Sequence, residues 1–279
     1  MENIKTFILM ALLVLLFMYF GNLIGGQSGM TIALAAAVFM NFFSYFFSDK
    51  MVLSHYKATE VNANTQPELY AMVQKLAHTA GLPMPKVYIV PEDVPNAFAT
   101  GRNPEHAAVA VTRGLLQTLS SQEIEGVLAH EMSHINHRDI LISSVAAMFA
   151  GAIANIGNFA RVGGTAQSNN RQRGGLSSLL GVMLMPLAAA IIQMSISRTR
   201  EYKADEGAAY LTEHPEWLMA ALQKLENFAK NYRMNNASTQ TAHMFIVNPF
   251  SGLSGLLQTH PSTKDRIARL AEISKTLRH

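Results

Sequence analysis

Long stretches without charged residues set the strongest limit on how this chain can fold. Only 15% of its 279 residues are charged, and no Asp, Glu, Lys or Arg occurs in residues 6–48, 140–160 or 174–197. The first stretch is long enough for two membrane spans separated by the glycine-rich segment 21–29, and each of the others could cross once. We expect up to four transmembrane helices, although the second pair could instead form a buried helical hairpin in a soluble core.

Other features of the composition narrow the class of protein. The apolar N-terminus is predicted to remain as an anchor, because a second apolar run follows at once and no small-x-small cleavage site separates them. The chain has no cysteine and therefore no disulfide. Its formal charge is only +3. The basic residues are not interleaved with aromatic residues as in nucleic-acid-binding proteins, so no nucleic acid partner is expected.

A short polar motif follows the first soluble segment, where residues 130–134 read His-Glu-Met-Ser-His. Two histidines four residues apart share one face of a helix and can bind one zinc ion, and the adjacent glutamate can take a proton from a water on that zinc. Ser120 and Glu123 fit a capping box, and apolar residues then recur at helical spacing. A hydrolytic metal centre is therefore expected, with Glu131 as its base.

Zinc requires at least one more protein ligand. His137 is nearby, but the longer three-histidine motif needs glycine at 137 and histidine at 140, where this chain has His137 and Ile140. We interpret His137 as a helix-end histidine, which is favourable near the carbonyl dipole. Glu201 is the other candidate, and Asp205, one turn later, could accept the ring N–H of a zinc histidine. Spacing alone leaves open that both carboxylates lie on a solvated helix face.

Taken together, the motifs resemble a known family. The chain is similar to HtpX-type membrane zinc metalloproteases, in the wider group that includes the Ste24 prenyl-protein proteases. The resemblance covers almost the whole chain and rests on His130-Glu131-x-x-His134, Glu201-x-x-x-Asp205, Asn96-Ala97-Phe98-Ala99 and Thr259-His260-Pro261-Ser262. It implies a zincin-like catalytic domain of the gluzincin type. It also implies that the two motif histidines and Glu201 hold one Zn²⁺ per chain, with Glu131 as the catalytic base.

The resemblance gives roles to residues outside the zinc motif. Asn96, Ala97 and Phe98 would lie on an edge strand beside the zinc, where a peptide can bind by strand addition. Without the resemblance, Asn96 reads as a turn residue. His260 would stabilise the oxyanion, or it simply precedes the last helix. Arg266 would pair with a carboxylate of the same site.

The expected fold class is α+β and mostly helical, with a small β-sheet. Helices are predicted at residues 66–80, from 120 through the histidine motif, at 215–234 and at 262–277, and strands at 86–90 and 107–112. The expected parts are an N-terminal pair of spans (1–48), a first catalytic part (49–139), a hydrophobic hairpin (140–197) and a second catalytic part (198–279).

The predicted metal site also limits the membrane topology. Its histidines precede the third charge-free stretch and Glu201 follows the fourth, so the chain must cross the membrane an even number of times between residues 139 and 198. Seven Lys or Arg residues lie between residues 48 and 139 and eleven from residue 198 onward. The positive-inside rule therefore places the catalytic parts in the cytoplasm. Three arginines, at 161, 171 and 173, lie in the loop between the last two charge-free stretches and would face outward if both stretches span the membrane. The sequence therefore leaves open how deeply this hairpin enters the membrane.

The predicted function is that of a membrane-anchored zinc endopeptidase. The resemblance implies a bacterial inner membrane, polypeptide substrates that include misfolded or damaged membrane proteins, and a role in protein quality control and stress response. The alternatives are a specialised protease of the prenyl-protein-processing type and a non-catalytic membrane scaffold. A scaffold would not need Glu131. A transporter would carry polar or charged groups inside its spans, which the charge-free stretches argue against.

Overall fold

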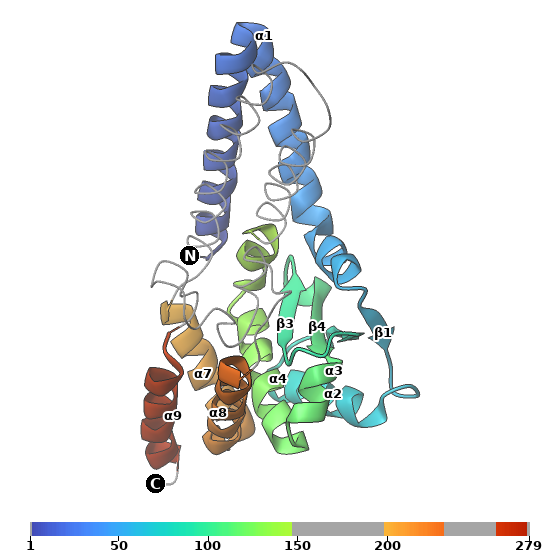
Figure 1. Ribbon diagram of the computed structural model, residues 1–279, viewed down its shortest axis with the longest axis vertical. Helices are drawn as coiled ribbons and strands as arrows, with labels where there is room; N and C mark the ends of the chain where they lie inside the picture. The colour runs from blue at the N-terminus through green and yellow to red at the C-terminus, as the bar shows by residue number, and fades with distance from the viewer. Residues whose placement is uncertain (1, 147–197, 232–260, 278–279) are drawn as a thin grey trace.

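The computed structural model describes residues 2–146, 198–231 and 261–277. A long helical hairpin extends from one end of a domain that contains a small sheet and several helices (Figure 1). The predicted α+β, mostly helical fold is therefore confirmed. Most of the predicted second hydrophobic hairpin, residues 147–197, and His260 lie outside the described residues.

Helix α1 (Glu2–His55) forms the hairpin by reversing at Gly25 and Gly26, the two residues with non-helical backbone angles. Gly26 has a φ of +58°, a conformation that glycine adopts without steric cost. The predicted break over residues 21–29 is therefore wrong in extent. The helix also continues past the expected boundary at residue 48.

The other glycines of this segment serve packing. A Cβ on Gly29 would collide with the carbonyl oxygen of Gly21, and one on Gly21 would lie 2.5 Å from the Cβ of Ala33. The two arms of α1 therefore approach closely at these small residues, which remain helical. A cluster of glycines predicts a loop from sequence, whereas here two of the four glycines, Gly21 and Gly29, allow close contact between helices.

Both arms of α1 suit a membrane. By length and composition alone, Thr6–Leu23 and Gly25–His55 could each cross one. Large apolar side chains along the arms are exposed, including Phe7 at 73%. The Asn41 side chain donates from Nδ2 to the carbonyl oxygen of Met10 at 3.0 Å and so ties the arms together. Such interhelical hydrogen bonds are a common feature of helix packing in lipid.

The sheet has four strands in the order β1-β2-β4-β3. Its strands are β1 (Thr59–Val61), β2 (Lys86–Val90), β3 (Ala97–Gly101) and β4 (Ala107–Thr112). Strands β2 and β4, which match the predicted strands, pair in parallel, and the other neighbours are antiparallel. Strand β3 is an edge strand, as expected for the segment that begins after Asn96.

Different elements cover the two faces of the sheet. Alternate strand residues point to opposite faces. Val109 and Val111 belong to the main core, which includes residues of α2 (Pro67–Thr79) and α4 (Ser121–Asn136). On the other face, Ala110 packs with Val52 and Leu53 from the end of α1. The membrane hairpin thus continues directly into the covering of the sheet.

Helix α4 begins with the predicted capping box. The backbone N–H of Ser120 donates to Oε2 of Glu123 at 2.7 Å, and the Glu123 N–H points back to the Ser120 hydroxyl. A Cβ on Gly126 would lie 2.7 Å from the backbone nitrogen of Leu218, so this glycine lets another helix approach closely. The chain becomes helical again at residues 140–146.

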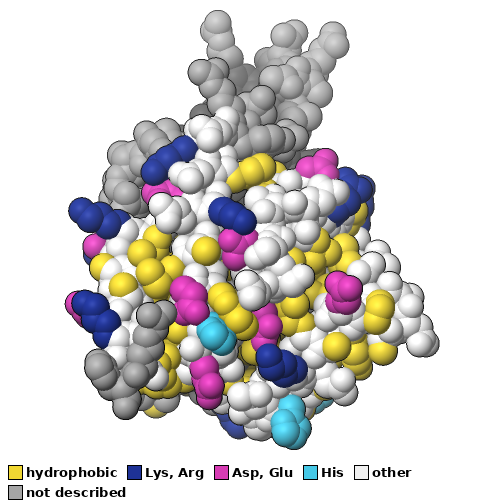
Figure 2. Space-filling view, turned by 90° about the horizontal axis from the view of Figure 1, so that it is seen from below, with side chains coloured by type: hydrophobic (Ala, Val, Ile, Leu, Met, Phe, Trp, Pro, Cys, Tyr) yellow, Lys and Arg dark blue, Asp and Glu magenta, His cyan; other side chains and the backbone are white. Residues whose placement is uncertain are grey.

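The remaining described helices differ in what they pack against. They are the short η1 (Pro104–His106) and α3 (Arg113–Thr118), then α7 (Arg198–Thr212), α8 (Pro215–Asn231) and α9 (Thr263–Leu277). Helices α7 and α8 contact α4, and α9 contacts both α7 and α8. Viewed from the end opposite the hairpin, acidic and basic side chains are interspersed around apolar ones (Figure 2).

Candidate metal centre

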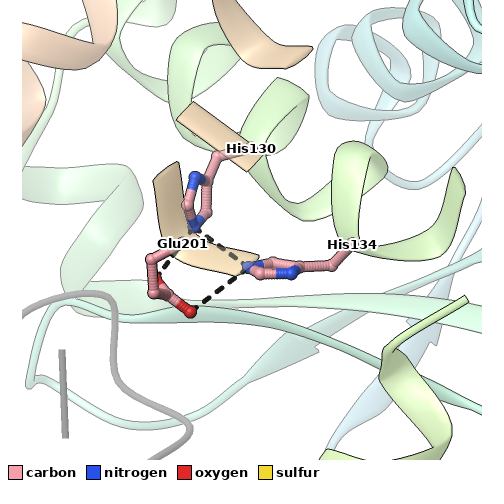
Figure 3. A group of neighbouring side chains, drawn as sticks. All are labelled: His130, His134 and Glu201. Atoms are coloured by element: carbon pink, nitrogen blue, oxygen red, sulfur yellow. Dashed lines mark hydrogen bonds and ion pairs between the residues drawn. The ribbon is translucent and has the colours of Figure 1, made fainter. Parts of the chain in front are cut away.

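Helix α4 and helix α7 bring three potential metal ligands together. His130 and His134 lie one turn apart, with their Nε2 atoms separated by 3.2 Å. The Glu201 carboxylate faces both, at 3.6 Å from Nε2 of His130 and 3.7 Å from Nε2 of His134 (Figure 3). One ligand atom from each residue lies within 4.8 Å of the others. The structure therefore brings together the three residues that the family resemblance implies as metal ligands.

Close packing of α7 on α4 delivers Glu201. A Cβ on Gly207 would collide with the hydroxyl of Ser133, which lies inside the histidine motif. Glycine at this position allows the two helices to approach closely. Glu201 and Asp205 are both buried on the α7 face that meets α4.

His130 is supported by an ion pair that joins three helices. Its Nδ1 lies 3.0 Å from Oδ1 of Asp205. Arg266 on α9 donates to both oxygens of Asp205, from Nε at 2.8 Å and from a terminal nitrogen at 2.6 Å. The Arg266 and Asp205 side chains are 1% and 2% exposed. The carboxylate partner expected for Arg266 is thus Asp205.

His134 is supported by a residue that the sequence analysis missed. Its Nδ1 lies 3.1 Å from Oδ1 of Asp139, which is buried just beyond the end of α4. The available signal was an acidic residue five positions after the second histidine, where a chain leaving the helix can turn back. The backbone makes that turn at Arg138, whose φ is +58°.

The surrounding charges favour a positive charge between the histidines. Burial alone would lower the pKa of His134, but Asp139 and Glu201 raise it to about 10. Burial also works against the charged form of His130, yet hydrogen bonds with Asp205 and Glu201 raise its pKa. A bound cation satisfies the same electrostatic demand as a proton would, and it does so for both rings at once.

The ligand atoms lie close enough together for one metal ion to bind all three residues. Two ligands bound to zinc at about 2.0 to 2.1 Å in a tetrahedron lie about 3.3 Å apart. The two Nε2 atoms are 3.2 Å apart, Oε2 of Glu201 is 3.6 Å from Nε2 of His130, and Oε1 of Glu201 is 3.7 Å from Nε2 of His134. With each Nδ1 directed at a carboxylate, the Nε2 lone pairs are available to a metal. The residues present therefore fit a metal ion.

Glu131 lies beside this centre and touches the edge strand. Its Oε2 accepts a hydrogen bond from the backbone N–H of Ala99 at 2.8 Å. Burial raises the pKa of Glu131, although the neighbouring histidines oppose this. A carboxylate with a raised pKa is better matched to proton transfer near neutral pH.

The predicted peptide-binding segment is only partly directed at the centre. Ala97 shares the core face of β3 with Ala99, whereas the Phe98 ring packs on the opposite face, 5.4 Å from the ring of Tyr56, the first residue after α1. Asn96 is buried, and among the described residues its Oδ1 has no hydrogen-bond partner. The Phe98 side chain thus belongs to the contact between the sheet and the membrane hairpin.

The remaining histidine of this region is separate from the centre. His137 caps the C-terminus of α4 and is exposed, which agrees with its interpretation as a helix-end residue. It is not among the three clustered ligands.

Comparisons with known proteins agree with this geometry. Residues 63–274 match the model of Peptidase family M48. The chain is 63% identical over 99% of its length to a "Protease HtpX homolog" of Campylobacter hominis, covering 100% of that protein. It is 60% identical to a homolog of the same name from Campylobacter curvus, with 100% of both chains covered, and 50% identical to one from Paraburkholderia phytofirmans, with 98% and 97% covered.

A solved structure supports the fold. The crystal structure of S. mikatae Ste24p aligns with a TM-score of 0.52 and 19% identity, over 92% of this chain and 62% of that one. At this identity the likeness concerns the fold alone, and the present chain spans less than two thirds of Ste24p. The family model and the full-length relatives are decisive: this chain belongs to peptidase family M48 and is a membrane metalloprotease similar to the HtpX proteases.

Proposed function

We propose that the chain is a zinc endopeptidase in which His130, His134 and Glu201 hold one zinc ion. The observation that carries this proposal is the 3.2 Å separation between the two Nε2 atoms. Two neutral rings whose Nδ1–H groups face carboxylates direct only lone pairs at each other, an arrangement that a metal ion stabilises. Imidazole ligands suit zinc, whereas magnesium and calcium prefer oxygen ligands alone. Bound zinc lowers the pKa of water and polarises a carbonyl group.

Glu131 is the proposed general base. Its carboxylate takes a proton from the attacking water and passes it to the leaving amine. Its place next to the histidines and its raised pKa support this role. Asp205 and Asp139 orient the rings of His130 and His134, and Arg266 balances the charge of Asp205.

Strand β3 is the proposed peptide-docking edge. Main-chain hydrogen bonds to an edge strand position an extended peptide with little regard to its sequence. The contact between Ala99 and Glu131 brings the edge beside the proposed base and uses the Ala99 N–H, so an added peptide would bond to Ala97 and to the outward carbonyl oxygen of Ala99. Asn96 and Ala97 lie at the start of this edge, whereas the Phe98 backbone pairs with β4, so Phe98 supports the edge rather than bonding to the peptide. His260, which lies outside the described residues, remains proposed to stabilise the oxyanion.

The proposed substrates are misfolded or damaged membrane proteins of a bacterial inner membrane, cut on the cytoplasmic side in protein quality control. The two candidate spans support a multi-pass protein in the bilayer. The excess of Lys and Arg in the catalytic parts supports the cytoplasmic side.

The general base is tested with Glu131→Gln in the purified, zinc-loaded protein. Cleavage of an unfolded polypeptide should fall about 10²- to 10⁴-fold, with zinc content unchanged. Glu125→Gln is the matched control, because Glu125 lies on the same helix and pairs with Lys75 instead. Retained cleavage by Glu131→Gln would eliminate Glu131 as the base.

The ligand set is tested by metal analysis of Glu201→Ala. Its zinc content should fall, while Glu206→Ala, which changes an exposed carboxylate of the same helix, should bind zinc normally. Unchanged zinc content in Glu201→Ala would remove Glu201 from the ligand set. Reactivation of the stripped enzyme by other divalent ions but not by zinc would overturn the choice of metal.

The topology is tested by labelling single cysteines, since the chain has none of its own. Cysteine at the exposed positions Glu105 or Lys203 should react with an impermeant thiol reagent in inverted membrane vesicles. Labelling from the opposite side in right-side-out vesicles would contradict the cytoplasmic assignment.

A further inference from the structure

The outer edge of β3 forms hydrogen bonds with two other parts of the protein, one of which is not part of the candidate metal site. In an antiparallel pair, alternate residues bond to the neighbouring strand, and the others turn their N–H and C=O groups away from it. The backbone N–H of Thr112 donates to the carbonyl oxygen of Asn96 at 2.9 Å. By the register of the β3–β4 pair, the outward-facing residues are therefore Ala97, Ala99 and Gly101.

Two of these outward N–H groups bond to other parts of the protein. That of Ala99 donates to Glu131 at 2.8 Å, and that of Gly101 points to the hydroxyl of Ser144 at 3.4 Å. Ser144 lies on the helical residues 140–146, which begin the third charge-free stretch of the chain. The edge strand therefore contacts the proposed base at its middle and the start of an apolar segment at its end.

The Ser144 hydroxyl uses all of its bonding capacity here. It donates to the carbonyl oxygen of Ile140 at 2.8 Å and lies 2.7 Å from the hydroxyl of Thr100. Because a hydroxyl has one hydrogen and two lone pairs, Thr100 is the donor to Ser144, and the second lone pair faces the Gly101 N–H. Thr100 and Ser144 are both 0% exposed, so water does not replace these bonds.

The other end of β3 has an independent attachment. The backbone N–H of Asn96 donates to the Thr112 hydroxyl at 2.8 Å, in addition to the ladder bond between these residues. Loss of the Ser144 contact should thus release the Gly101 end while Ala97 stays in place. Gly101 has a φ of +137°, and a Cβ there would collide with the carbonyl oxygen of His106, so glycine is required at the point where Ser144 meets the strand.

We propose that Ser144 is a positioning residue for peptide hydrolysis. Through Thr100 and Gly101 it fixes the end of β3, so that the Ala99 N–H keeps the Glu131 carboxylate oriented toward the metal ligands. The proposal rests on Glu131 being the general base, as proposed above. It also makes the rate of the reaction depend on the position of the helical residues 140–146.

The test compares kinetic constants of the zinc-loaded, full-length enzyme with an unfolded polypeptide substrate. Ser144→Ala should lower kcat roughly three- to tenfold, the effect of one lost hydrogen bond on a rate, with KM changed less than about twofold. Thr100→Val should do the same, whereas Thr100→Ser keeps the hydroxyl and should restore kcat. Ser143→Ala is the matched control, because within the described part of the chain the Ser143 hydroxyl points to the backbone carbonyl oxygen of Asp139, one turn earlier, and makes no contact with β3.

A double variant distinguishes a positioning role of the Thr100–Ser144 contact from a general loss of structure. Thr100→Val with Ser144→Ala should lose no more activity than either change alone, because both remove one contact. Full kcat in Ser144→Ala, multiplied losses in the double variant, or zinc loss that accounts for the lower rate would each overturn the proposal. If Glu131→Gln is inactive and Ser144→Ala is fully active, this proposal fails while the proposed function stands. If Glu131→Gln stays active, the proposed function itself fails.

Discussion

The two histidines of the candidate metal centre are supported in contrasting ways. His134 is backed by Asp139, only five positions further along the chain. His130 is backed by Asp205 on α7, which is held by Arg266 on α9, 61 positions later. The His134 side chain is 17% exposed and that of His130 only 2%. The His134 side of the centre, which we call the local side, is partly exposed and is supported from nearby in the chain. The His130 side, which we call the assembled side, is buried and is supported by distant helices.

Because of this difference, we expect metal binding to depend on the packing of distant helices only at His130. A buried ion pair gains little over apolar packing, but removal of one partner leaves an uncompensated charge. Asp205 and Arg266 must therefore be buried together, when α7 and α9 pack against α4. The local side needs only the end of α4 and the turn at Arg138. We expect substitutions on the assembled side to affect stability and metal binding together, and those on the local side to affect chiefly the metal.

The largest effect is expected for Arg266→Ala. It leaves the buried Asp205 carboxylate without its partner, at a cost of about 3 to 5 kcal/mol in the free energy of unfolding, and zinc content should fall with it. Thermal unfolding in detergent with metal analysis measures both. Arg269→Ala is the control, since Arg269 lies on the same helix over the Tyr202 ring and is exposed. Equal stability of the two variants would contradict the importance of the assembled side.

A smaller effect is expected for Asp139→Asn. Loss of a carboxylate behind a metal-bound histidine lowers metal affinity about 10- to 100-fold, and competition with a chelator measures this. The unfolding temperature of the metal-free protein should change less than in Asp205→Asn, which also leaves Arg266 buried without its partner carboxylate. If Asp139→Asn were the more destabilising of the two, the contrast between local and assembled sides would be reversed.

A more modest effect is expected for Gly207→Ala, which pushes α7 away from α4. Overpacking at this contact should cost about 1 kcal/mol, because the added methyl meets one side chain. Zinc affinity should weaken as Glu201 moves with α7. Ser133→Ala removes the hydroxyl that the methyl would strike, so it should partly rescue Gly207→Ala. If Ser133→Ala restored neither stability nor zinc affinity in Gly207→Ala, the close approach of α7 to α4 at Gly207 would not be what positions Glu201.

The smallest effect is expected at the start of α4. Burial would raise the pKa of Glu123, but hydrogen bonds from Lys224 and Ser120 lower it below its ordinary value. The stabilisation is therefore present above the unfolded pKa of about 4.3 and is lost as the pH falls through the lower folded pKa. Lys224→Met should reduce stability by up to about 1 kcal/mol at pH 7.

The pH dependence and zinc binding check this last prediction. The difference in unfolding free energy between Lys224→Met and the wild type should shrink when the pH is lowered from 6 toward 3. Zinc affinity at pH 7 should be unchanged, because the cap lies at the end of α4 away from the histidines. An unchanged difference at low pH would show that Lys224 acts through packing rather than through the charge of Glu123.

Sequence patterns were reliable where the interactions are local. The capping box, the helical spacing and the positions of β2 and β4 depend on neighbours within a few residues, and the structure agrees. The glycine cluster at 21–29 misled because glycine favours both loops and close helix packing. The orientation of Phe98 could not be read, because either face of an edge strand can hold an aromatic ring.

By itself, the sequence determined the chemistry of α4: two histidines and a carboxylate at helical spacing, on a helix with a strong start signal, in a chain with long apolar segments. Only the tertiary structure decided that Asp205 and Arg266 form one buried pair behind His130, that Asp139 supports His134, and that Ser144 meets the end of β3. The physical reason is that helix formation and capping are set within a few residues, whereas the partner of a buried charge or hydroxyl is set by which distant surfaces pack together.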